Sequence, residues 1–328
     1  MDRRSFLVSG AAAVAATSPQ WLSETGLSKP GQDPQPAPDA AAQDPVKQEP
    51  ATQTPGAEPF KLLYAPHFDM FSSHAKSLED QLQFAADNGF RAGEDNGMAG
   101  KDEATQRQLA AKMEKCGIQM GVFVAHGDFD DPTFASGKKE FQERVLADID
   151  KACTVAGRVN AAWCTVVPGS IDPRKDEGYQ FANTVELLKR CCDKIEQNKS
   201  ELVMVLEPLS FINHPNLYLT KMAQGYALCR AVGSPHCKIL DDLYHQQITE
   251  GNLIHNIDTA WSEIAYFQVG DNPGRQEPYT GEINYNNVFR HIHKKGFKGI
   301  VGMEHGKSQG GKEGELKLIK AYRDADTF

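Results

Sequence analysis

The chain has 328 residues, of which 40% are hydrophobic and 24% are charged, and its formal net charge is -9 at pH 7. The longest apolar stretch without a charge covers residues 6–16, which is shorter than the roughly 20 residues that a membrane-spanning helix needs. These features argue against a transmembrane protein, and the acidic balance argues against a protein that binds a nucleic-acid backbone.

The N-terminus resembles a twin-arginine export signal. Arg3 and Arg4 precede Phe6-Leu7 and an alanine-rich segment in which Ala13 and Ala15 offer a small-residue cleavage site. We therefore expect residues 1–16 to be a signal peptide, the twin-arginine export machinery to be a partner, and the protein to reach the periplasm or cell envelope. Residues 17–59 hold half of the 18 prolines, and they predict a disordered Pro/Gln/Ala-rich tether.

Residues 60–328 predict one catalytic domain in which short β-rich runs alternate strictly with longer helical runs. Such alternation indicates a parallel sheet, and eight units of this kind fit a closed (β/α)8 TIM barrel of the α/β class. The absence of a GxGxxG motif after the first strand disfavours a dinucleotide-binding fold. The predicted strands are 62–66, 90–94, 119–124, 160–166, 202–207, 238–242, 264–269 and 299–304, and the predicted helices are 77–88, 103–115, 138–156, 177–198, 220–232, 252–261, 286–295 and 314–324.

Four consecutive predicted strands, the fifth to the eighth, end in or near an acid or amide. The active sites of barrels of this kind lie at the C-terminal ends of the strands. Carboxylates that are crowded there repel one another, and a divalent cation would relieve that repulsion. An all-oxygen ligand set favours Mg²⁺ or Mn²⁺ over Zn²⁺, while the alternative is that each acid caps a loop or pairs with a nearby Lys or Arg. The four residues are Glu207, Asp242, Gln268 and Glu304.

The same region resembles the hydroxypyruvate isomerases, which belong to the xylose isomerase-like TIM barrels. The resemblance rests on Glu207-Pro208-Leu209, on the run from Lys238 to Gln247, on the run from Gln268 to Tyr285, and on Gly302-Met303-Glu304. It implies that Glu207, Asp242, Gln268 and Glu304 bind a metal ion, and that Glu207 and Glu304 are the catalytic pair. It also implies a possible homodimer. The implied activity is a metal-dependent isomerisation of hydroxypyruvate to tartronate semialdehyde through an enediolate.

Five further residues are candidates for substrate binding. His245, three residues after Asp242, is expected to contact substrate oxygens, or alternatively to be a buried histidine satisfied by the backbone. Arg275 is expected either to bind a substrate carboxylate or to pair with Glu277 or Glu282. The remaining candidates, which follow other strands, are Glu94, His126 and His67.

Other functions are compatible with the same barrel. The chain could be an exported ketose 3-epimerase or another sugar isomerase, or a sugar-binding protein of the envelope that performs no catalysis. A DNA-repair endonuclease is disfavoured, because its zinc site would need more histidines and its surface more positive charge. Three residues depart from the family pattern at the predicted pocket rim: Gln276, His305 and Lys307.

Overall fold

The structure is a computed structural model that describes residues 57–328. The predicted signal peptide and nearly all of the predicted tether lie outside the described residues. No helix among those described is both long and apolar enough to cross a bilayer. The strands are β1 (Leu63–Pro66), β2 (Ala92–Gly93), β3 (Gln119–Met120), β4 (Val124–Gly127), β5 (Trp163–Val167), β6 (Val203–Leu206), β7 (Cys237–Asp242), β8 (Ile264–Gln268) and β9 (Ile300–Met303).

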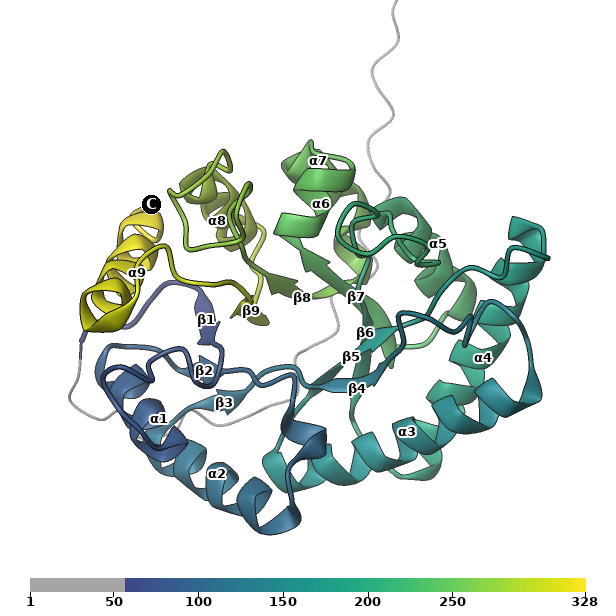
Figure 1. Cartoon of the computed structure of the whole chain (residues 1–328), viewed down its shortest axis with the longest axis horizontal. Helices are drawn as coiled ribbons and strands as arrows, with labels where there is room; N and C mark the ends of the chain where they lie inside the picture. The colour runs from purple at the N-terminus through teal and green to yellow at the C-terminus, as the bar shows by residue number, and fades with distance from the viewer. Residues whose placement is uncertain (1–56) are drawn as a thin grey trace, which may run out of the picture. The chain divides into compact units, whose positions relative to one another are not determined.

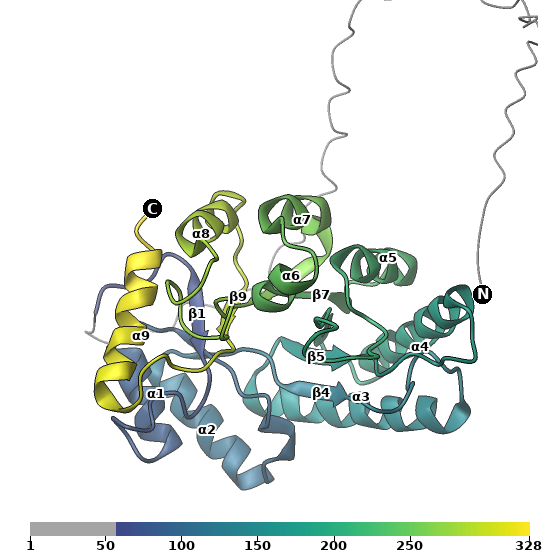
Figure 2. The ribbon, with the colours of Figure 1, turned by 45° about the horizontal axis from the view of Figure 1, so that its top comes forward.

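Helices follow the strands and surround them on the outside (Figure 1, Figure 2). Local sequence explains several of their ends, since Ser77 and Asp102 accept backbone N–H groups at two N-termini and Gly117 ends the second helix in a left-handed conformation. The helices are α1 (Leu78–Asp87), α2 (Glu103–Cys116), α3 (Lys139–Val159), α4 (Glu177–Gln197), α5 (Met222–Val232), α6 (Leu243–Thr249), α7 (Leu253–Ala260), α8 (Tyr285–Lys294) and α9 (Gly311–Ala325).

The strands form a curled parallel sheet. Seven of them pair in the order β1-β9-β8-β7-β6-β5-β4, and β2 pairs with β3. Single backbone bridges join the two groups, one between His67 and Glu94 and one between Met120 and Ala161. β3 and β4 are two parts of one barrel strand, so the nine strands β1 to β9 make eight barrel strands. The predicted (β/α)8 barrel is therefore confirmed.

A layer of apolar side chains fills the inside of the barrel. Side chains alternate between the two faces of a strand, so the residue two positions further along each strand also points inward. The same rule makes polar side chains point inward at the C-terminal end of the barrel. Two positions separate Ala92 from Glu94, Val205 from Glu207, and Tyr266 from Gln268. The layer consists of Ala65, Ala92, Val122, Val205, Leu240, Tyr266 and Ile300.

Two local features differ from the predicted elements. The third barrel strand is interrupted between β3 and β4, and its pairing register shifts between Val124 and His126. The short helix α6 begins directly after β7, because the Asp242 carboxylate accepts the backbone N–H of Tyr244 at 2.9 Å. A residue expected only at a strand end therefore also starts a helix.

A buried carboxylate joins the loop after β1 to the start of α9. Glu315 is fully buried and accepts hydrogen bonds from the backbone N–H groups of Ser73 and His74 and from the Lys307 ammonium group. Burial alone would raise the pKa of Glu315, but the hydrogen bonds from His74, Ser73 and Lys307 outweigh it and lower the pKa to about 2. The charged form of Glu315 therefore stabilises the folded chain.

Glu315→Gln is expected to lower the free energy of unfolding by about 2 kcal/mol at neutral pH. Because the folded pKa lies below the unfolded one, the difference from wild type should be constant above about pH 5 and shrink as the pH falls towards 2. Urea denaturation at several pH values measures it, with the exposed Glu313→Gln on the same helix as control. A pH-independent difference would contradict the assignment.

Candidate active site

The C-terminal ends of the barrel strands bring the predicted ligands together. Asp242 and Gln268 are paired residues at the ends of β7 and β8, and Gln268 is paired in turn with Gly302 of β9. Glu207 and Glu304 directly follow β6 and β9. Of the four predicted ligands, only Glu304 is more than slightly exposed. Parallel pairing thus places side chains that are far apart in sequence at one end of the barrel.

Glu207, Asp242 and His245 form the tightest group. One ligand-type atom of each lies within 4.8 Å of the others, and all three side chains are buried. The backbone N–H of Ser210 donates to His245 Nδ1 at 3.3 Å, which makes Nδ1 an acceptor. Burial lowers the pKa of His245 to about 4, so the ring is neutral and Nε2 carries the proton. Nε2 therefore offers a donor rather than a metal-binding lone pair.

That donor has no hydrogen-bond partner among the described residues. His245 Nε2 is buried and unpartnered, and the Asp242 carboxylate is 3.7 Å away. A buried, unsatisfied N–H beside the carboxylates is placed to donate to a substrate oxygen. The protein therefore satisfies His245 at Nδ1 alone, and the substrate contact at Nε2 stays a prediction.

Glu94 orients the amide of Gln268. Glu94 is fully buried, accepts the Tyr266 hydroxyl at 2.8 Å, and accepts Gln268 Nε2 at 3.4 Å. With its nitrogen committed to Glu94, Gln268 presents Oε1, which is buried and has no partner in the described chain. Gly302 makes this possible, because any Cβ at that position would overlap the Glu94 carboxylate. The expected substrate contact of Glu94 stays a prediction, and the hydrogen bonds that the structure gives Glu94 are with Tyr266 and Gln268.

Glu304 is held from two sides. Asn96 Nδ2 donates to its Oε1 at 2.6 Å, and Arg275 Nη2 donates to its Oε2 at 2.8 Å. The same Arg275 nitrogen donates to Asp242 Oδ2 at 2.7 Å. Arg275 therefore pairs with two of the predicted ligands and with neither Glu277 nor Glu282. Asn96 was not among the predicted site residues, although it lies two residues after Glu94 and so just beyond a predicted strand end.

The cluster concentrates several carboxyl groups in a buried space. Burial, followed by the charges of Glu304 and Asp242, raises the pKa of Glu207 well above its usual value. Burial also raises the pKa of Glu304 to about 7, against the opposing effect of Arg275. Carboxylates with raised pKa values can gain and lose protons near neutral pH. They would also be stabilised in their charged form by a bound cation.

The two remaining histidine candidates lie in different surroundings. The His126 ring contacts Asp148 of α3 at 2.7 Å and Thr133 at 3.3 Å, so the structure does not bring it to the cluster. The physical reason is the register shift in β4, since a one-residue irregularity changes which way a side chain points. His67 follows Ala65 of the inward-facing layer, and burial lowers its pKa.

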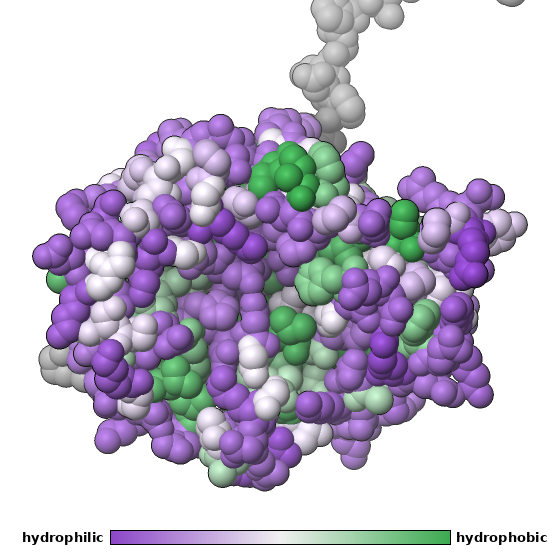
Figure 3. Space-filling view, viewed as in Figure 1, coloured by the Kyte–Doolittle hydropathy of each residue, from purple (hydrophilic) through white to green (hydrophobic). Residues whose placement is uncertain are grey.

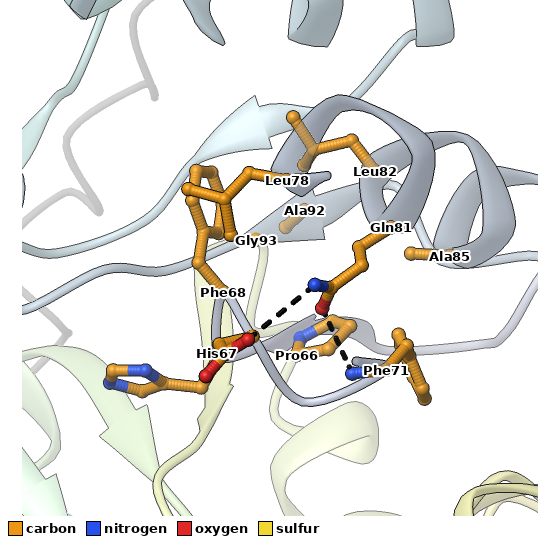
Figure 4. Close-up of a pocket in the computed structure, with 11 residues that line it drawn as sticks. Pro66, His67, Phe68, Phe71, Leu78, Gln81, Leu82, Ala85, Ala92 and Gly93 are labelled. Carbon is orange, nitrogen blue, oxygen red and sulfur yellow. Dashed lines mark hydrogen bonds between the residues drawn. The ribbon is translucent and has the colours of Figure 1, made fainter. Parts of the chain in front are cut away.

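A small cavity lies behind His67, between the loop after β1 and helix α1 (Figure 4). Its volume of about 10 Å³ leaves room for at most one water molecule. Gln81 crosses it and binds the backbone N–H of Phe71, while the His67 ring points away from the lining (Figure 4). The cavity is therefore not a substrate pocket.

Two residues that depart from the family pattern have structural contacts. His305 Nε2 hydrogen-bonds with the Tyr322 hydroxyl at 2.8 Å, and Lys307 donates to the carbonyl of Met70 and to Glu315. Both fix the loop after β9 to the rest of the barrel. They shape the rim of the site without entering the carboxylate cluster.

The described residues fit a divalent cation. Glu207 and Asp242 supply carboxylate oxygens, as does Glu304, which shares the Arg275 contact with Asp242, and the orphaned Oε1 of Gln268 supplies an amide oxygen. Oxygen donors of this kind suit hard cations. The candidate substrate donor, His245 Nε2, lies beside them.

Comparisons with known proteins identify the family and the fold of the chain. Residues 82–324 match the family described as xylose isomerase-like TIM barrel. The chain is 34% identical to the putative hydroxypyruvate isomerase of Homo sapiens over 271 residues, which is 80% of this chain and 96% of the relative. It is 26% identical to 2-oxo-tetronate isomerase of Cupriavidus necator over 77% of this chain and 95% of the relative.

A third relative matches over a shorter span. Identity to hydroxypyruvate isomerase of Escherichia coli is 37% over 126 residues, which is 38% of this chain and about half (48%) of that relative. Among solved structures, an AP endonuclease of family 2 from Brucella melitensis has a TM-score of 0.66 at 20% identity, covering 78% of this chain and 98% of the other. D-psicose 3-epimerase from Clostridium cellulolyticum has a TM-score of 0.62 at 18% identity, covering 80% and 91%. These two structures share the fold.

Proposed function

This chain belongs to the xylose isomerase-like TIM barrel family and is an isomerase, and we propose that it interconverts an α-hydroxy aldehyde and its ketone isomer through an enediolate. The proposed model reaction is the conversion of hydroxypyruvate to tartronate semialdehyde. One observation carries the proposal: carboxylates, an orphaned amide oxygen and an unpartnered histidine N–H converge at the C-terminal end of the barrel. Named relatives that are hydroxypyruvate and 2-oxo-tetronate isomerases support it.

We propose that Mg²⁺ or Mn²⁺ is the cofactor, held by Glu207, Asp242, Gln268 and Glu304. When bound, the cation would polarise the substrate carbonyl and stabilise the negative charge that develops on its oxygen. Glu94 contributes by fixing the Gln268 amide with its oxygen towards the site. Outer contacts of this kind commonly determine how well a ligand is oriented.

Glu207 and Glu304 are the proposed proton-transfer groups. One carboxylate removes a proton from the hydroxymethyl carbon, which gives the enediolate, and a carboxylic acid returns a proton to the neighbouring carbon. The hydroxyl proton moves between the two substrate oxygens, so atoms and charge balance. The raised pKa of Glu304, about 7, suits a group that must alternate between acid and base.

His245 and Arg275 are the proposed orienting residues. His245 Nε2 donates to a substrate oxygen without adding negative charge to the cluster. Arg275 uses Nε and Nη2 for the Glu304 carbonyl and for the two carboxylates, and its side chain is partly exposed. Its remaining nitrogen is available for a substrate carboxylate.

The reaction is tested by NMR in deuterated water with the purified chain, hydroxypyruvate and Mn²⁺ or Mg²⁺. The expected result is tartronate semialdehyde that carries deuterium at the carbon receiving the proton. Deuterium exchange on free ketoses without aldose formation would instead identify a 3-epimerase. Sugar binding without any exchange would identify an envelope sugar-binding protein.

We also propose that residues 1–16 direct export through the twin-arginine machinery. Replacing Arg3 and Arg4 by Lys removes the paired guanidinium groups while keeping the charge. The expected result is retention of the protein in the cytoplasm, measured by cell fractionation and immunoblotting. Unchanged export of the double variant, with an Arg107→Lys control, would contradict the proposal.

A further inference from the structure

Four large apolar side chains are exposed beside the active site, and we call them the apolar wall: Phe129, Ile171, Phe211 and Ile212. Their exposed fractions are 49%, 39%, 55% and 65%. They lie in the three loops that follow β4, β5 and β6, which are at the same end of the barrel as the carboxylates. The face drawn in Figure 3 is mostly hydrophilic, and its apolar side chains gather in separate patches.

The three loops are joined into one surface by backbone hydrogen bonds. The N–H of Ser170 donates to the carbonyl of Asp131, and the N–H of Ile171 donates to the carbonyl of Asn216, both at 2.9 Å. A small buried cluster of Val167, Leu209 and Leu217 packs the second loop against the third. The apolar wall is therefore held in place rather than presented on independent loops.

A chain of ring contacts connects the apolar wall to the catalytic cluster. The centroid of the Phe129 ring lies 5.2 Å from that of His214, and His214 lies 5.3 Å from His245. Burial and the Arg275 charge lower the pKa of His214, so this ring is neutral as well. On either side of Phe129 in the sequence, Asp128 and Asp131 both pair with Arg144, which offsets part of their negative charge.

The His214 ring separates the apolar wall from the catalytic cluster, and this limits which ligands contact both. A three-carbon acid that binds beside His245 would have the whole His214 ring between it and Phe129. The arginines nearest to the apolar wall in sequence already pair with carboxylates of the chain, Arg144 with Asp128 and Asp131 and Arg174 with Asp172. A ring joined to the reacting sugar can reach it, and the apolar C–H face of a pyranose packs on aromatic rings such as Phe129 and Phe211.

We infer that the apolar wall is a subsite for a pyranose ring, and that the substrate is a keto sugar extended by such a ring. This inference rests on the proposed isomerase function, for which it names the substrate class. The continuity of Phe129, His214 and His245 assigns the apolar wall to the substrate rather than to a second copy of the chain. Large exposed apolar groups of this kind commonly mark binding sites.

Calorimetry with the Mn²⁺-loaded full chain tests the inference independently of turnover, with isomaltulose, a glucosyl-fructose, and hydroxypyruvate as probes. Phe129→Ala combined with Phe211→Ala is expected to weaken isomaltulose binding by about 10-fold and to change hydroxypyruvate binding by less than about twofold. Both side chains are exposed, so the variant should fold. Leu316→Ala, an equally exposed apolar residue on α9, is the control and should change neither.

The inference is overturned if wild type does not bind isomaltulose, if the double variant binds it unchanged, or if both probes weaken equally. A smaller assembly of the double variant in size-exclusion chromatography would also overturn it, because the apolar wall would then be an interface between copies. Selective isomaltulose binding without deuterium exchange on any substrate would uphold the subsite and reject the isomerase proposal. A failure of the subsite inference can therefore be distinguished from a failure of the isomerase proposal.

Discussion

Glu207→Gln and Glu304→Gln are each expected to reduce kcat by about 10³-fold or more, because each removes a group that carries a proton during the reaction. Both side chains keep their size, and the amide removes a charge whose burial is unfavourable. Glu207→Gln should therefore fold at least as stably as wild type, whereas Glu304→Gln loses one of the contacts with Asn96 and Arg275 and should be slightly less stable. Initial rates with hydroxypyruvate or the identified substrate, together with thermal denaturation, measure the two quantities.

A carboxylate at the same end of the barrel but outside the cluster provides the control. Glu282 is exposed and accepts hydrogen bonds from Asn272 and Gln247, so Glu282→Gln should leave kcat within about twofold. The Glu207→Gln/Glu304→Gln double variant should lose little more than either single variant, because the two groups act in one reaction. Wild-type turnover in either single variant would refute the proposed pair.

Asp242→Asn is expected to weaken Mn²⁺ binding by about 100-fold or more, since it replaces a charged ligand by a neutral one. Asn is also a good N-cap, so helix α6 should keep its start after Asp242 is replaced. Calorimetric titration with Mn²⁺ measures the affinity. The same titration gives the affinity without any assumption about the substrate.

The adjacent residue supplies a matched control. Asp241 is equally buried, but it points to the opposite face of β7 from Leu240 and Asp242. Burial raises the pKa of Asp241 well above its usual value, so its neutral form is favoured and Asn is a close substitute. Asp241→Asn should leave Mn²⁺ affinity nearly unchanged, whereas equal losses at both positions would place the cation elsewhere.

Alternation along the chain was sufficient to predict the barrel. Glycines mark several of the helix ends, and apolar runs mark the strands, so the order of elements follows from local sequence. The rule that sites lie at strand C-termini then selected Glu207, Asp242, Gln268 and Glu304. The structure gathers these residues at the same end of one sheet.

Only the tertiary structure decided what the neighbouring side chains do. Whether Glu94 faces substrate or protein depends on Tyr266 and Gln268, which lie more than 170 positions away in sequence. The orientation of His126 depends on a register shift in β4, and the partners of Arg275 depend on the ends of β7 and β9, which lie on either side of β8. Sequence periodicity fixes which face a residue occupies, but hydrogen-bond partners are set by packing between distant segments. The amino-acid sequence thus determined the barrel and the candidate ligands, while the folded structure determined which groups remain unpaired and available for chemistry.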